Sequence, residues 1–130
     1  MLAKLISSTG EEGEAMIIEI KGRQITGMDN VVYSALPYPQ QGKEFEVKFT
    51  CMFDDDADIG VNPFEELALV STGLWSYRVL AKLVSVDSND GIALADCGAC
   101  LLPIPVEVSD PDCLGRFIGF DILRLDIWRG

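Results

Sequence analysis

The sequence predicts a mainly β protein, a small antiparallel barrel or rolled sheet of about five to six strands with one short helix. Two apolar runs, at residues 75–86 and 92–104, are dense in β-branched and aromatic residues. The Asp-Ser-Asn-Asp-Gly segment between them is typical of a hairpin turn. A third run of the same kind covers residues 117–128. An OB-like barrel is the common architecture with this element count, so we expect it here.

The N-terminal part of the chain is expected to contribute an arm, a strand and a loop. Residues 7–14 are polar and rich in glycine, which predicts a mobile arm or a turn. Residues 15–28 begin with alternating apolar and polar side chains, which predicts a strand; Gly22 and Gly27 would weaken or bend its second part. The two prolines within residues 35–42 favour a loop, because they suit neither a helix nor a central strand.

Residues 43–53 carry the cleanest strand pattern of the chain. Every second position is apolar, and the set comprises Phe45, Val47, Phe49, Cys51 and Phe53. Alternation with period two over this length predicts a strand with one buried and one solvated face.

A short helix is predicted after an acidic loop at residues 54–60. Asn62 suits the N-cap, Pro63 the first helical position, and Glu65 a capping box. The helix would end near Val70. Negative charge beside its N-terminus would be favourable, so the bland interpretation of the preceding residues is a solvated acidic loop.

The apolar phase slips by one position within the last run. One parity is shared by Ile118, Phe120 and Ile122, and the other by Leu123, Leu125 and Ile127. A β-bulge that turns a strand around a barrel corner produces such a slip. The alternative is that Ile122 and Leu123 are both buried, because the strand is covered on both faces.

Composition favours a single domain over residues 1–130. The hydrophobic fraction of 48% argues against a disordered chain. No stretch approaches the roughly 20 apolar residues that a membrane-spanning helix needs. The N-terminal residues lack the apolar core of a secretory signal, so we expect a cytoplasmic protein.

The net charge of −11 bears on the choice of partner. A field of this sign repels phosphate backbones and anionic lipid, so we expect neither a nucleic-acid nor a membrane partner. Two interpretations stay open. The acidity keeps a small apolar protein in solution, or it complements a basic protein partner.

The chain contains no histidine, which excludes Ser-His and Cys-His nucleophile arrangements. An enzyme would have to rely on other groups, such as the carboxylates of Asp96 and Asp121, brought together at a substrate site. We expect no enzymatic activity.

The charged residues on the last strand have two possible roles. Asp121, Arg124 and Asp126 could form ion pairs with Arg78 and Lys82 of an earlier strand. The alternative is a polar site in a barrel mouth.

The acidic loop also has a weak calcium-binding pattern. Oxygen ligands of an EF-hand type loop occur at positions 1, 3, 5, 9 and 12, and counting from Asp54 these positions are Asp54, Asp56, Asp58, Asn62 and Glu65. The glycine comes one position late, at Gly60, and a strand rather than a helix precedes the loop. A solvated loop is therefore the preferred interpretation, and calcium the alternative.

Cys97 and Cys100 form a CxxC motif, the spacing of zinc knuckles and of dithiol redox sites. Zinc would require Cys51 and Cys113 as further ligands, and their spacing is not that of a zinc ribbon. The prolines that follow argue against the helix of a thioredoxin-like site. Buried structural thiols are the preferred interpretation; a disulfide or redox role and a metal site stay open.

Together these observations predict a small, acidic, non-enzymatic protein that binds another protein, of the inhibitor, immunity or adaptor kind, with a basic partner. Exposed strand edges would also permit a homo-oligomer. The alternative is a β-barrel that binds a small ligand or a metal ion and needs no other cofactor.

Overall fold

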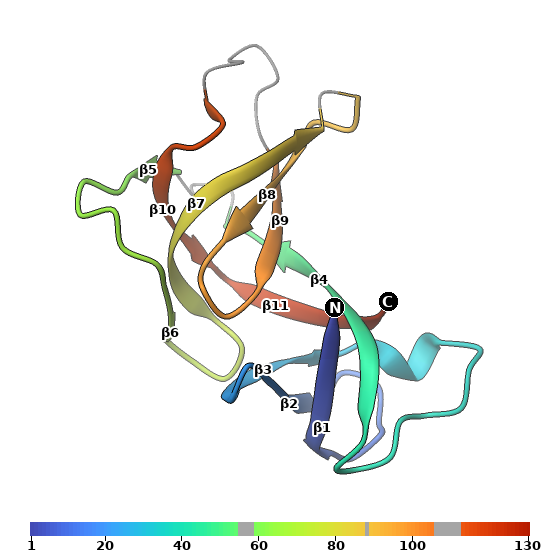
Figure 1. The fold of residues 1–130 in the computed structure, drawn as a ribbon. Coiled ribbons are helices and arrows are strands. Elements are labelled where there is room, and N and C mark those ends of the chain that lie inside the picture. Colours follow the sequence, from blue (N-terminus) through green and yellow to red (C-terminus); the bar gives the residue numbers. More distant parts are fainter. Residues whose placement is uncertain (55–58, 88, 106–112) are drawn as a thin grey trace.

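The computed structural model describes residues 1–54, 59–87, 89–105 and 113–130. It confirms the predicted class, since the chain is mainly β and contains a closed five-stranded barrel. Around the barrel the strands follow the order β1-β2-β3-β11-β4, and β4 pairs with β1 to close it (Figure 1). The barrel strands are β1 Leu2–Ser8, β2 Ala15–Ile20, β3 Arg23–Asp29, β4 Glu44–Met52 and β11 Arg124–Arg129. All neighbours are antiparallel except β3 and β11, which run parallel.

A second sheet is inserted in the chain between β4 and β11. Its strands follow the order β5-β10-β7-β8-β9, and β6 also pairs with β7. The bounds are β5 Gly60–Val61, β6 Ala68–Ser71, β7 Tyr77–Asp87, β8 Ile92–Asp96, β9 Leu101–Pro105 and β10 Phe117–Ile122. The predicted hairpin at residues 87–91 is confirmed, because β7 and β8 pair antiparallel across it.

Strands β10 and β11 follow one another with a single residue, Leu123, between them. The predicted phase slip falls at this residue, where the chain leaves the second sheet and enters the barrel (Figure 1). Ile122 is buried, whereas Leu123 is 52% exposed. The alternative in which both side chains are buried is therefore wrong. The slip marks a corner that passes from one sheet to the other.

One hydrophobic core cluster takes side chains from both sheets. Phe53, just after β4, and Phe120 of β10 have ring centroids 5.8 Å apart. Tyr77, the first residue of β7, reaches the barrel: its hydroxyl donates to the carbonyl of Thr26 at 2.7 Å and accepts from the amide of Thr26 at 2.9 Å. The second sheet is thus tied to β3 by apolar packing and by this one side chain.

Two predicted single strands are in fact hairpins. Residues 15–28 fold into β2 and β3, because Lys21 and Gly22 both adopt positive φ, of 51° and 76°. Two consecutive positive φ values make the tight turn whose twist matches antiparallel strands. Residues 92–104 likewise divide into β8 and β9, joined by the CxxC segment. The strand predicted at 43–53 is confirmed as β4, with Phe45, Val47 and Phe49 buried.

The predicted helix from Asn62 to Val70 is wrong. The described residues contain no α-helix; the short element η1, Val31–Tyr33, is a 3-10 turn. Glu65 has a left-handed φ of 53°, which ends any helical path. Ala68 to Ser71 instead pair with β7 as β6. Helix-capping residues are also turn residues, and here the partner strand decides between the two outcomes.

The segment 7–14, expected to be an arm or a turn, contains the end of β1 and the connection to β2. A hydrogen bond from the amide of Gly10 to Ser8 Oγ, of 3.1 Å, lies within it. Among the described residues, no helix is long and apolar enough to cross a membrane.

We expect Tyr77→Phe to lower the free energy of unfolding by about 1–3 kcal/mol, since it leaves both backbone groups of Thr26 without their partner. Urea unfolding followed by tryptophan fluorescence measures the change. Tyr33→Phe is the matched control: its ring is exposed, and a change of about 0.5 kcal/mol or less is expected. Equal effects of the two substitutions would contradict a bridging role for Tyr77.

Candidate functional site

The predicted calcium ligands are only partly within the described residues, because Asp56 and Asp58 lie outside them. Asn62 is 3% exposed, and its side chain is used within its own loop. Its Oδ1 accepts the amide of Phe64 at 3.3 Å, and its Nδ2 donates to the carbonyl of Glu66 at 2.8 Å. Asp54 and Glu65 are exposed. In the described part of the chain, no group of three or more His, Cys, Asp or Glu residues is arranged to hold a metal ion. The calcium loop stays a prediction.

The same loop presents large apolar side chains to solvent. We call residues 59–67 the 59–67 surface. Val61 is 84% exposed and Phe64 is 75% exposed, with Ile59 and Leu67 less so. They project outward because the buried Asn62 holds the backbone in a tight turn. The helix prediction missed this surface, since it assigned Phe64 and Leu67 to a helix. The sequence signal for it was Phe64, which stands between Pro63 and the charged Glu65.

A groove of about 480 Å³ lies between this surface and the start of β10. It is lined by Ile59, Gly60, Val61, Asn62, Pro63, Glu65, Gly115, Arg116, Phe117 and Ile118. Strand β5 forms the outer wall. It has only two residues and pairs with Ile118 and Gly119, so it is a short edge strand. The groove therefore combines apolar side chains with a sheet edge.

The CxxC motif occupies the turn between β8 and β9. Cys97 and Cys100 are both buried, and their sulfur atoms lie 3.7 Å apart. A hairpin replaces the helix of a thioredoxin-like site, which agrees with the argument from the following prolines. All four cysteines are free thiols.

Cys51 of β4 belongs to the same neighbourhood, a grouping that the sequence spacing did not reveal. Burial raises the pKa of the Cys51 thiol to about 12, with further contributions from the negative charge of a Cys97 thiolate and of Asp126. A hydrogen bond from the thiol of Cys100 lowers the pKa of Cys97 to about 7, against the effect of burial. The same interaction, together with burial, raises the pKa of Cys100. The three thiols are therefore chemically distinct.

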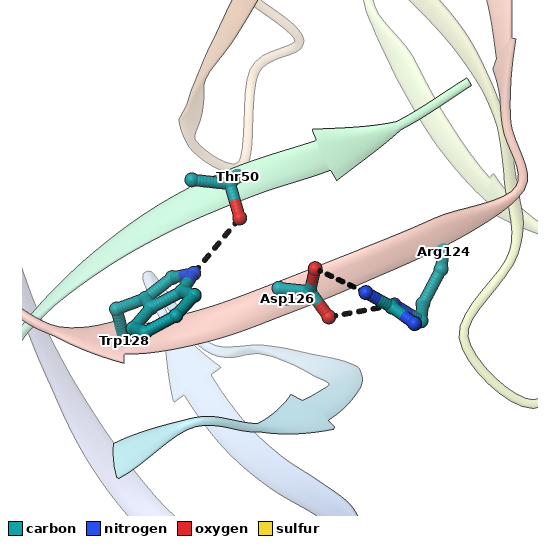
Figure 2. A network of polar contacts seen from close by, with 4 residues as sticks. All are labelled: Thr50, Arg124, Asp126 and Trp128. Atoms are coloured by element: carbon teal, nitrogen blue, oxygen red, sulfur yellow. Dashed lines mark hydrogen bonds and ion pairs between the residues drawn. The ribbon is translucent and has the colours of Figure 1, made fainter. Parts of the chain in front are cut away.

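Cross-strand ion pairs were predicted between the last strand and Arg78 or Lys82, and one of them is present in the described part of the chain; a second pair, within β11, was not predicted. Asp121 of β10 lies opposite Arg78 of β7 in the ladder, with 3.6 Å between Oδ1 and the guanidinium. Arg124 and Asp126 of β11 form a two-bonded pair of 2.8 Å and 3.1 Å along one strand (Figure 2). Beyond Asp126, the indole of Trp128 donates to Thr50 Oγ1 at 2.8 Å (Figure 2).

A further polar cluster was not predicted. Asp29 is fully buried at the end of β3, where one carboxylate oxygen accepts from Ser8 at 3.0 Å and from the Tyr38 hydroxyl at 2.5 Å. Its other oxygen accepts the amide of Val31 at 2.9 Å. Burial and the hydrogen bond to Asp29 raise the pKa of Tyr38 to about 12. Each carboxylate oxygen has partners, which indicates a structural role in fixing η1 against the barrel.

Asp96 and Asp121, the carboxylates of the enzymatic alternative, are far apart. In the strand ladders Asp96 lies opposite Lys82 and Asp121 lies opposite Arg78, and these two partners are four residues apart on β7. At about 3.3 Å per residue, Asp96 and Asp121 are about 13 Å apart along β7. This is beyond the spacing at which two carboxylates act on one bond. Asp96 also accepts the amide of Gly98 at 2.8 Å.

No protein-family model, no curated protein and no solved structure matches this chain. Two features of the molecule therefore bear on its function, the 59–67 surface with its groove and the thiols of the CxxC turn.

We expect Arg124→Met to lower the free energy of unfolding by about 1–3 kcal/mol, because the buried Asp126 carboxylate then loses both hydrogen bonds from the guanidinium. Thermal and urea unfolding measure it. The control Arg78→Met removes an exposed pair of 3.6 Å, for which about 1 kcal/mol or less is expected. A larger loss of stability for Arg78→Met than for Arg124→Met would contradict the expectation that the partly buried pair stabilises the fold more than the exposed pair.

Proposed function

We propose that this chain is a non-enzymatic binding domain that takes an apolar segment of a basic partner protein at the 59–67 surface. The observation that carries the proposal is the exposure of Val61 and Phe64 beside a groove of about 480 Å³. Clustered apolar side chains exposed to water are unfavourable for an isolated protein and mark interaction sites. Inhibitors, immunity proteins and adaptors act in this way.

The charge distribution supports a basic partner. Glu65 and Glu66 are exposed within the 59–67 surface, and the whole chain carries a net charge of −11. Complementary charge would speed the encounter and set the orientation, while Val61 and Phe64 would supply most of the buried apolar area. The salt dependence of binding should therefore appear mainly in the association rate.

The edge strand supports an extended segment as the bound element. The outer side of β5 has no paired strand among the described residues. A peptide laid along Gly60 and Val61 could add backbone hydrogen bonds there and place its side chains in the groove.

We also propose a cytoplasmic location. The four free thiols support it, because structural disulfides form in oxidising compartments.

A photo-crosslinking amino acid at position 64, introduced in cells of the source organism, tests the proposal. We expect a crosslink to one protein of basic charge. In a binding assay with that purified protein, Val61→Asp with Phe64→Asp should weaken affinity by at least about tenfold, equivalent to about 1.4 kcal/mol. High salt should slow association.

Leu36 provides the matched control for the crosslinking. It is an exposed apolar residue in the loop that follows η1. Figure 1 shows this loop at the end of the barrel away from β5. Equal crosslinking from positions 36 and 64 would contradict a specific surface. A crosslink only to a second copy of the chain would replace the basic partner with a homo-oligomer, and an acidic partner would overturn the role of charge.

A further inference from the structure

The CxxC turn brings its two cysteines directly opposite one another. Asp96 and Leu101 are the last paired residues of β8 and β9, so Cys97 and Cys100 are the next two across the hairpin. The amide of Cys97 donates to the carbonyl of Cys100 at 3.1 Å, which continues the ladder by one step. Gly98 and Ala99 form the two-residue connection, and Gly98 has a left-handed φ of 91°.

This placement suits a covalent bond between the sulfur atoms. Opposite residues in an antiparallel ladder have Cα atoms about 4.5–5.5 Å apart, within the span that a disulfide bridges. The sulfur atoms are 3.7 Å apart as thiols, and both side chains lie on one face of the hairpin. Side-chain rotation that closes this gap to the bond length of about 2.05 Å would form the bond without moving the strands.

We propose that Cys97 and Cys100 form a reversible disulfide and act as a two-electron redox site for small hydroperoxides. The Cys97 thiolate attacks hydrogen peroxide, and the oxygen–oxygen bond breaks to give a sulfenic acid on Cys97 and hydroxide. The sulfur of Cys100 then attacks the sulfenic sulfur and displaces its hydroxyl group, which leaves as water with the Cys100 proton. The hydroxide takes up the proton that Cys97 released when it ionised, so two thiols and one peroxide become one disulfide and two water molecules.

The environments of the two sulfur atoms assign these roles. The pKa of Cys97, lowered to about 7 by hydrogen bonds from the Cys100 thiol and nearby backbone amides, makes a large fraction of this residue the nucleophilic thiolate at neutral pH. Cys100, with its pKa raised, stays protonated as the donor. Cys51 stays a thiol as well, since its pKa is raised to about 12.

Burial selects the size of the oxidant. Cys97 is 1% exposed and Cys100 is 3% exposed, so neither sulfur is reached from solvent while the turn is closed, and a local opening of the turn would admit a small hydroperoxide far more readily than a protein disulfide. The bond would close a loop of only four residues, the least stabilising kind of disulfide. The fold therefore does not need the bond, and a small dithiol that enters when the turn opens can reduce it by thiol–disulfide exchange.

The test is oxidation of the whole folded protein with hydrogen peroxide, followed by alkylation, intact mass and peptide mapping. We expect two of the four thiols to disappear, a mass loss of two hydrogens, and a disulfide that joins Cys97 to Cys100. The rate should rise with pH, reach half its maximum near pH 7 and level off above that, following ionisation of Cys97. Circular dichroism should not change.

Matched variants separate the roles. Cys100→Ser keeps a hydrogen-bond donor beside Cys97 but has no second thiol, so it should accumulate a sulfenic acid on Cys97 that dimedone traps. Cys97→Ala should give no adduct on Cys100. Cys51→Ala and Cys113→Ala should oxidise as the natural chain does. Peptide mapping of the natural chain decides the matter even if a variant fails to fold. The proposal is overturned by a disulfide to Cys51 or Cys113. It is equally overturned if oxidation is no faster than in the urea-unfolded chain, or follows the pH profile of an ordinary thiol. None of these results depends on the 59–67 surface.

Discussion

The structure depends on one continuous segment, residues 117–129, which serves both sheets. As β10 it lies between β5 and β7, and as β11 it fills the gap between β3 and β4 that would otherwise leave the barrel open. The corner between the two halves is held by backbone bonds. The amide of Leu123 donates to the carbonyl of Met52 at 2.9 Å, and the amide of Leu125 donates to the carbonyl of Trp75 at 2.9 Å. A side-chain period of two cannot continue through such a corner, so the phase slip in the sequence is its direct trace.

The alternation of β4 and the phase slip could be predicted because both depend on which face of a single strand is buried. The parallel pairing of β3 with β11 could not, since it joins Met28 to Asp126 across most of the chain and has no local pattern. The 62–66 loop was mispredicted for a different reason. The Asn62 side chain that would cap a helix also satisfies a tight turn, and the pairing of β6 with β7 determines which one forms.

The candidate sites also combine features that a local sequence pattern predicts with features that depend on long-range pairing. The CxxC motif is visible in the sequence, but only the hairpin register shows that its sulfur atoms face one another, and only the packing of β4 brings Cys51 near them. The exposure of Phe64 depends on the turn that replaces the predicted helix, so it could not be predicted while a helix was expected there. The barrel interior is different. Ile18, Ile25 and Leu125 are fully buried and fill it, as a small barrel requires, so binding features have to lie on the loops and the second sheet.

The 59–67 surface and the CxxC turn are in contact at Gly98. A Cβ placed on this glycine would lie 3.5 Å from Cβ of Leu67, the last residue of the 59–67 surface. That contact distance is ordinary, so glycine is needed at position 98 for its left-handed φ and not for space. Leu67 nevertheless lies directly over the turn that holds Cys97 and Cys100. A partner that covers Leu67 would also narrow the path of an oxidant to these sulfur atoms. Binding and oxidation would then oppose one another through shared access, with no change of fold.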